Sequence, residues 1–246
     1  MKAFVLAAGY ATRLYPLTRE RPKALLEIGG VPMLTRIVDA IAVLPELSEI
    51  VVVGNARFAD AFATWGRSPR TTVPVRILND GSTEDANKLG AIGDLAFALR
   101  EAPVGDEDWL AVAGDNLLDF SLAPAHDAFA ARRMPLLLVR RQPPGPDASR
   151  YNEVTLDGEG RVVRFREKPT DPQTGLAAIA FYFFPATVAG AVDRYLAGGG
   201  NPDAPGHFIA WLVDEMPVCA WRIEGDSDWF DVGSIETLQQ ARDRYA

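Results

Sequence analysis

Histidine and cysteine are both scarce in this chain of 246 residues. Its two histidines, His126 and His207, give little support to a histidine-rich zinc site or a Ser-His-Asp triad. Cys219 is the only cysteine, so no disulfide can form within the chain, which fits a reducing compartment and a cytoplasmic protein. If the protein is an enzyme, we expect carboxylates, lysine, arginine and a hard metal ion to carry its chemistry.

Positive charge and long apolar runs are also in short supply. Lys and Arg total 25 against 33 Asp and Glu, and the formal net charge is -8. No nucleic-acid partner is expected, because phosphate-backbone binding relies on clustered cations. The apolar run KAFVLAAG near the N-terminus is too short to span a membrane, so we interpret it as a buried strand and expect no membrane partner.

Strand-like and helix-like segments alternate through the first half of the chain. The expected strands cover residues 2–8, 49–53, 73–78, 109–113 and 136–140, and the expected helices cover 32–44, 56–65 and 89–100. Leu34, Ile37, Val38 and Ile41 recur at the spacing of an amphipathic helix. Strands that alternate with helices in this way indicate βαβ units and a mainly parallel sheet.

The second half of the chain has a different pattern. Residues 152–169 hold two alternating segments around Asp157-Gly158-Glu159-Gly160, which predict a β-hairpin. A buried strand is expected at 177–185, and helices are expected at 208–216 and 234–245. The segments 143–146 and 198–205, rich in Pro and Gly, predict mobile loops. Because no linker or repeat is evident, we predict one α/β domain over residues 1–246 with an inserted antiparallel region.

The turn after the first strand, AAGYATRL at 7–14, has the composition of a phosphate site. It matches neither the dinucleotide G-x-G-x-x-G pattern nor the P-loop G-x-x-x-x-G-K-[ST] pattern. Small residues here would let backbone N–H groups approach a phosphate, and Arg13 and Lys23 would neutralise its charge. A tight turn with two solvated cations explains the same residues equally well.

Two aspartates follow apolar segments and are candidate metal ligands. Asp115 comes after the strand WLAVAG, so its carboxylate is expected at the edge of a parallel sheet where ligands bind. Asp231 lies between aromatic residues and Gly233. Each is equally compatible with a turn or a helix cap, but together they suit one Mg²⁺, which takes one or two carboxylates plus phosphate and water.

Five segments, in order along the chain, resemble the motifs of the sugar-1-phosphate nucleotidyltransferases. They are LAAGYATRLYPLT at 6–18, RPKALLEIGG at 21–30, AGDN at 113–116, EKP at 167–169 and WFDVG at 229–233. Ala11 stands where the family has a second glycine, and Glu27 where it has a proline. The resemblance spans residues 1 to about 240. It implies the Rossmann-like, three-layer α/β/α nucleotide-diphospho-sugar transferase fold, with a mixed, mainly parallel central sheet.

The resemblance also implies a role for individual residues. The nucleotide site would comprise Ala8, Gly9, Tyr10, Ala11, Thr12, Asn79, Gly90 and Asp115. The catalytic cations would be Arg13, Lys23 and Lys168, and Asp115 and Asp231 would hold Mg²⁺. The sugar phosphate would lie against Asn152, Glu167, Lys168 and Ala180. Asn152 and Ala180 replace glycines of the family and add bulk near the sugar, which bears on the identity of the acceptor.

The reaction that the resemblance implies is attack of a sugar 1-phosphate on the α-phosphorus of an NTP, assisted by Mg²⁺, with release of pyrophosphate. The partners would be an NTP and a sugar 1-phosphate, and a homodimer is a family-level expectation. The nucleotide stays open among dTTP, UTP, GTP and CTP, and the sugar also stays open.

Three alternatives are weighed against this reaction. The same chemistry on choline phosphate or inositol phosphate would be cytidylyltransferase-like, and Phe181-Tyr182-Phe183-Phe184 could supply an aromatic cage for choline. A non-catalytic regulatory protein that binds nucleotide sugars is disfavoured, because all of the expected catalytic and metal-binding residues are present. A nicotinamide oxidoreductase is disfavoured by the absent G-x-G-x-x-G.

Overall fold

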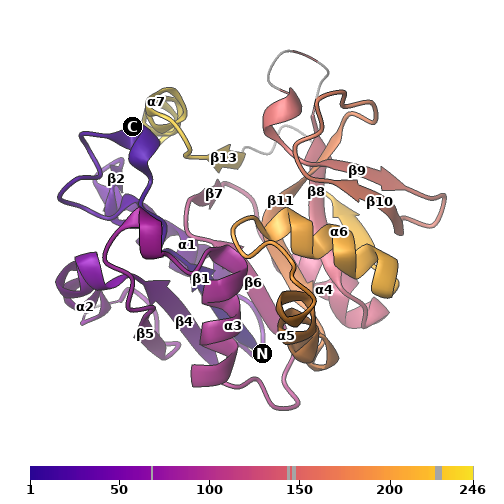
Figure 1. Cartoon of the computed structure of the whole chain (residues 1–246), viewed down its shortest axis with the longest axis horizontal. Coiled ribbons are helices and arrows are strands. Elements are labelled where there is room, and N and C mark those ends of the chain that lie inside the picture. The colour runs from indigo at the N-terminus through magenta and orange to yellow at the C-terminus, as the bar shows by residue number, and fades with distance from the viewer. Residues whose placement is uncertain (68, 143–144, 146–147, 225–228, 246) are drawn as a thin grey trace.

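The computed structural model describes residues 1–67, 69–142, 145, 148–224 and 229–245. Its centre is a sheet of seven strands in the order β12-β8-β11-β6-β1-β4-β5 (Figure 1). The strands are β1 Lys2–Leu6, β4 Glu49–Gly54, β5 Val75–Asn79, β6 Trp109–Ala113, β8 Leu136–Arg141, β11 Leu176–Phe184 and β12 Cys219–Arg222. β11 runs antiparallel to both of its neighbours, and the other neighbouring pairs are parallel. The prediction of a mixed, mainly parallel sheet is confirmed.

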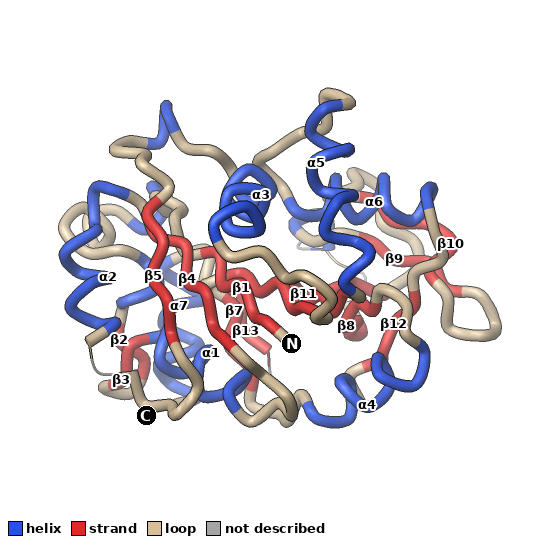
Figure 2. Tube along the Cα trace, turned by 90° about the horizontal axis from the view of Figure 1, so that it is seen from below, coloured by secondary structure: helices blue, strands red, loops and turns tan. Residues whose placement is uncertain are grey.

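Helices cover both faces of this sheet (Figure 2). One face carries α1 Met33–Ala42, α2 Ala59–Gly66, α4 Ala123–Arg132 and α7 Ile235–Arg244, and the other carries α3 Ala91–Glu101, α5 Ala189–Ala197 and α6 Pro205–Glu215. Successive strand residues point to opposite layers: in β1, Ala3 and Val5 belong to one core and Phe4 to the other. The architecture is therefore the three-layer α/β/α arrangement.

Three short antiparallel ladders lie outside the main sheet. β9 Glu153–Leu156 pairs with β10 Val162–Arg166, which confirms the predicted hairpin. β2 Glu27–Ile28 pairs with β3 Val31–Pro32, and β7 Asn116–Leu118 pairs with β13 Trp229–Asp231. Short 3-10 turns cover Thr12–Leu14, Lys23–Leu25, Ala56–Phe58, Asp85–Asn87, Ala148–Arg150 and Ala186–Val188.

The structure describes one of the two predicted mobile loops in full and the other only in part. Of the segment 143–146 only Gly145 is described, and the rest lies outside the described residues. The segment 198–205 packs against the beginning of α3, because the carbonyl of Pro202 accepts a hydrogen bond from Ile92 N at 2.8 Å. Within the described residues, no helix has the length and apolar content that crossing a membrane requires.

Candidate active site

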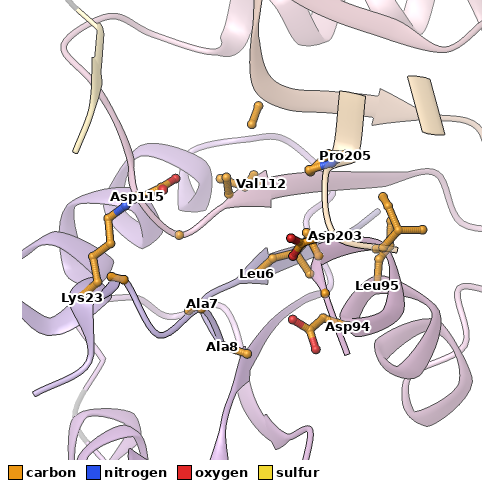
Figure 3. Close-up of a pocket in the computed structure, with 18 of the residues that line it drawn as sticks. Leu6, Ala7, Ala8, Lys23, Asp94, Leu95, Val112, Asp115, Asp203 and Pro205 are labelled. Atoms are coloured by element: carbon orange, nitrogen blue, oxygen red, sulfur yellow. Dashed lines mark hydrogen bonds and ion pairs between the residues drawn. The ribbon is translucent and has the colours of Figure 1, made fainter. Parts of the chain in front are cut away.

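A cavity of about 590 Å³ opens at the carboxyl ends of β1 and β6. Ligands bind at this edge in open α/β sheets. Its wall combines the turn after β1, the turn after β6, the beginning of α3 and the segment that leads into α6. Figure 3 shows Lys23 and Asp115 on one side, Asp94 and Asp203 on the other, and the strand end Leu6–Ala8 between them.

The turn after β1 is held by side chains from neighbouring segments. Asn55 Nδ2 donates to the carbonyl of Ala8 at 2.7 Å, and Thr18 Oγ1 donates to the carbonyl of Ala11 at 2.9 Å. Ala11 has a φ of 47°, a conformation that favours glycine, which accounts physically for the glycine expected there. The cavity is lined by all six predicted residues of this turn, namely Ala8, Gly9, Tyr10, Ala11, Thr12 and Arg13.

Lys23 and Asp115 form an ion pair inside the cavity. Lys23 Nζ lies 2.7 Å from Asp115 Oδ2, and Asn116 Nδ2 donates to Asp115 Oδ1 at 2.7 Å. Burial opposes the charged form of Asp115, but the Lys23 ammonium and the Asn116 amide outweigh it and lower the pKa of this carboxyl. Gly114 is needed beside it, because a Cβ at that position would lie 2.8 Å from the carbonyl oxygen of Leu6.

Asp231 reaches the same place through the ladder between β13 and β7. In this ladder the backbone of Asp231 lies opposite that of Asn116, and Val232 N donates to the carbonyl of Asp115 at 3.1 Å. Trp229 Nε1 donates to Asn116 Oδ1 at 2.6 Å, and the amide of Asn116 in turn donates to Asp115, so Asn116 links the tryptophan to Asp115. Burial, followed by the charge of Asp115, raises the pKa of Asp231 to about 6.

The donor set at Asp115 and Asp231 fits a single hard cation. Burial and then the charge of Asp115 raise the pKa of Asp231 despite the opposing charge of Lys23, and a bound cation would offset both effects. Among the described residues there is no cluster of three or more His, Cys, Asp or Glu side chains that could hold a metal ion. Two carboxylates suit Mg²⁺, which takes its remaining ligands from phosphate and water.

The predicted sugar-side residues are only partly brought together. Lys168 and Ala180 line the cavity, and Lys168 is exposed with a φ of 44°. Glu167 does not line it. The Glu167 carboxylate packs beside Gly206 at the beginning of α6, where any side chain in place of this glycine would meet it.

Asn152 and Asn79 also lie outside the lining of the cavity. The Asn152 amide bonds the backbone of Ala178 in both directions, at 2.6 and 3.0 Å, and so ties the beginning of β9 to β11. Asn79 Oδ1 accepts from the backbone N–H of Gly81 at 2.9 Å. Both amides therefore hold the backbone of their own region.

Gly90 lines the cavity as the residue before α3. Its φ is 81°, and a Cβ at this position would lie 2.6 Å from the carbonyl oxygen of Pro202. Glycine alone meets both constraints, the first of backbone conformation and the second of space.

Sequence reasoning missed four charged residues around Gly90. They are Asp85, Lys88, Asp94 and Asp203, and all of them line the cavity. Lys88 Nζ bridges Asp85 at 3.3 Å and Asp203 at 3.2 Å. Asp94 is buried and its Oδ1 has no hydrogen-bond partner among the described residues. The polar composition of residues 78–94 was a signal for a binding loop, but it did not single out these side chains.

The aromatic residues of β11 divide between the two cores. Tyr182 and Phe184 line the cavity, whereas Phe181 and Phe183 belong to the core on the opposite face of the sheet. Strand alternation thus leaves half of the cluster available to a ligand, and a cage for a choline group would lack its other half.

Comparison with known proteins gives one family and several relatives. The family model described as "Nucleotidyl transferase" matches residues 2–246. The chain is 29% identical over 250 residues to the glucose-1-phosphate thymidylyltransferase of Streptomyces antibioticus, covering 97% of this chain and 64% of that one. It is 26% identical over 254 residues to the UTP–glucose-1-phosphate uridylyltransferase of Synechocystis sp., covering 98% and 62%. It is 28% identical over 251 residues to that of Haloferax volcanii, covering 99% and 96%.

Solved structures share the fold. A protein of Bacillus anthracis provisionally named glucose-1-phosphate thymidylyltransferase superposes with a TM-score of 0.84 at 20% identity, covering 100% of this chain and 95% of that one. A UDP-glucose pyrophosphorylase in complex with UDP-glucose superposes with a TM-score of 0.82 at 17% identity, covering 99% and 97%. The chain spans 64% and 62% of the length of the first two relatives named above.

Proposed function

The chain belongs to the nucleotidyl transferase family, and from this premise we propose that it transfers a nucleoside monophosphate from UTP or dTTP to a sugar 1-phosphate. The observation that carries the proposal is the Lys23–Asp115 ion pair, which lies with Asp231 beside the turn of residues 8–13 in one cavity. The named relatives use UTP or form thymidylyl products with glucose 1-phosphate, so these substrates come first.

The nucleotide triphosphate lies along the turn after β1 in this proposal. Backbone N–H groups of the turn face its phosphates, and Arg13 and Lys23 balance their charge from the cavity wall. Asp115 and Asp231 hold Mg²⁺, which, when bound, offsets the charge on the phosphates during transfer. Because Lys23 already pairs with Asp115, its ammonium is positioned before the nucleotide arrives.

The acceptor lies on the side of Lys168 and β11. Lys168 attracts the sugar phosphate against its repulsion by the nucleotide, and Ala180 and Tyr182 line the space for the sugar. The attacking phosphate oxygen is already an anion near neutral pH, so the reaction requires no general base. Catalysis then consists of alignment and charge balance, which agrees with a chain that has only two histidines.

Pyrophosphate release tests the proposal directly. Purified protein with Mg²⁺ is combined with each of UTP, dTTP, GTP and CTP and with a panel of sugar 1-phosphates, including glucose 1-phosphate. We expect product with UTP or dTTP, and the reverse reaction from the NDP-sugar and pyrophosphate. No pyrophosphate release from any pair, with a folded protein that still binds nucleotide sugars, would favour the non-catalytic regulatory alternative.

A single domain over residues 1–246, a homodimer and a cytoplasmic location stay predictions.

A further inference from the structure

Asp94 is a buried acid that the proposed chemistry does not use. It belongs to α3, is 5% exposed, and lines the cavity. Its Oδ1 has no hydrogen-bond partner among the described residues. Figure 3 shows its carboxyl directed toward Ala8, across the cavity from Lys23 and Asp115. A buried polar atom left unpaired destabilises the protein, so a hydrogen-bond donor from a ligand is the expected counterpart.

The surroundings of Asp94 leave this oxygen as an acceptor. Asp80 accepts hydrogen bonds from Ser82 N at 2.7 Å and Ser82 Oγ at 2.8 Å, and Ser82 Oγ lies 3.0 Å from the hydroxyl of Tyr10. Ser82 therefore holds the Asp80 carboxyl in place. Burial, followed by the charge of Asp80 and a hydrogen bond with it, raises the pKa of Asp94 to about 8.

Asp94 consequently keeps its proton near neutral pH. Lys88, the lysine that lines this end of the cavity, is engaged by Asp85 and Asp203. Asp94 lines the cavity, and its buried Oδ1 keeps its lone pairs without a hydrogen-bond partner among the described residues.

The position of Asp94 places it opposite the base of the bound nucleotide. This step rests on the proposed function, in which the triphosphate lies along the turn after β1 and the acceptor lies toward Lys168. The base then occupies the remaining end, between Ala8 and the beginning of α3. We propose that Asp94 determines base specificity, with its Oδ1 accepting a hydrogen bond from N3–H of uracil or thymine.

The chemistry of the base edges makes this contact selective. Uracil and thymine carry an N–H at the centre of the Watson–Crick edge, whereas cytosine carries a lone pair at N3. An acceptor facing that position attracts the first two bases and repels the third. Guanine also has a central N–H, with an amino donor beside it, and would require both oxygens of a free carboxylate.

Nucleotide binding measured by calorimetry in the presence of Mg²⁺ tests the contact without relying on turnover. The ligands are UTP, CTP, GTP and N3-methyl-UTP, which lacks the N–H in question. The variants are Asp94→Ala, Asp94→Asn and, as a matched control, Asp127→Asn, which changes an aspartate 82% exposed on α4 across the sheet. Thermal unfolding of each variant establishes that it is folded.

We expect the wild type to bind UTP at least about tenfold more tightly than CTP or N3-methyl-UTP. Asp94→Ala should lower UTP affinity about tenfold and bring the UTP-to-CTP ratio near one. Asp94→Asn should keep its affinity for UTP through the amide oxygen and gain affinity for CTP through the amide N–H₂, which can donate to N3 of cytosine. Asp127→Asn should match the wild type.

An unchanged UTP-to-CTP ratio in Asp94→Ala would overturn the inference, and so would GTP as the tightest ligand or the absence of any nucleotide binding. The pyrophosphate assay separates this inference from the proposed function. Binding that depends on Asp94 in a protein without transferase activity removes the proposed function alone. An active transferase whose base preference ignores Asp94 removes the inference alone.

Discussion

Lys23 Nζ and Asp115 Oδ2 lie 2.7 Å apart although 92 positions separate them in the sequence. Lys23 belongs to a 3-10 turn that follows Pro22, and Asp115 belongs to the turn between β6 and β7. Their contact fixes a cation and an anion at the edge of the sheet before any substrate binds. Each charge lowers the energetic cost of burying the other.

Replacing Lys23 by Met should lower kcat by about 100-fold or more, because an ammonium that balances phosphate charge in the transition state is lost. The change also leaves the Asp115 carboxylate half-buried without its counter-ion. The measurement is steady-state pyrophosphate release. Lys2→Met is the matched control, since Lys2 pairs with Glu49 at 3.4 Å and does not line the cavity. Equal activity of the two variants would contradict the role given to Lys23.

Metal dependence should reveal Asp115 and Asp231 as one site. Chelation by EDTA should abolish turnover and added Mg²⁺ should restore it. Asp115→Asn and Asp231→Asn should each raise the Mg²⁺ concentration needed for half-maximal activity by about tenfold or more. Asp119→Asn, which changes an aspartate whose side chain is 19% exposed and which does not line the cavity, serves as control. Full activity of Asp115→Asn at low Mg²⁺ would exclude this metal site.

The Mg²⁺ requirement should also depend on pH. Asp231 has a pKa raised to about 6 in the protein without metal, so below that pH it carries a proton that Mg²⁺ must displace. We expect the Mg²⁺ concentration for half-maximal activity to rise by up to about tenfold for each pH unit below 6, and to be flat above 7. Titration with Mg²⁺ at pH 5, 6, 7 and 8 measures this. A requirement that stays constant down to pH 5 would mean that Asp231 is not a ligand.

All strands of the central sheet except β12, and the edge where ligands bind, could be predicted because they leave local signals. β4 and β6 are short continuous apolar runs, as buried parallel strands are. Their order along the chain, with helices between them, then places Asp115 at the carboxyl edge. The glycine of the first turn and the two cations that follow it also stand in one short segment.

Other features could not be predicted because they depend on distant pairing. The ladder between β13 and β7 brings Asp231 to Asn116, and neither three-residue strand shows a hydrophobic period of its own.

The helix α4 was missed because only Ala125 and Phe129 of its residues are buried, which leaves no apolar stripe. Asp94 did leave a signal that was overlooked: it stands on the buried stripe of α3, next to Leu95.

Asp94 should make the protein less stable as the pH rises. In the unfolded chain its carboxyl ionises near 3.8, whereas in the folded protein it keeps its proton up to about pH 8. The unfolded state therefore releases a proton across this window that the folded state retains. The free energy of unfolding falls by at most about 1.4 kcal/mol per pH unit for this group.

Urea unfolding at pH 5, 6, 7 and 8 measures this loss. Asp94→Asn should remove it and be more stable than the wild type at pH 8, because an amide cannot ionise. Asp127→Asn should follow the wild type, since that aspartate is exposed on α4. The titration of Asp231 also changes the free energy of unfolding below pH 6, but it does so equally in all three proteins. Parallel curves for Asp94→Asn and the wild type would show that Asp94 does not hold its proton.

Gly90 should tolerate no side chain, and the chain offers a control that separates the two reasons. Gly90→Ala forces an alanine into a φ of 81° and drives its Cβ to 2.6 Å from the carbonyl oxygen of Pro202. Gly105→Ala imposes a similar strain, at a φ of 60°, but its Cβ would meet nothing within 4 Å. We expect Gly105→Ala to lose about 1 kcal/mol of unfolding free energy. Gly90→Ala should lose more, and should also weaken nucleotide binding because the segment at Pro202 is displaced from α3. If the two variants proved equally stable and equally able to bind UTP, backbone conformation alone would explain the glycine, and the close packing of Pro202 on α3 would have no part in forming the site.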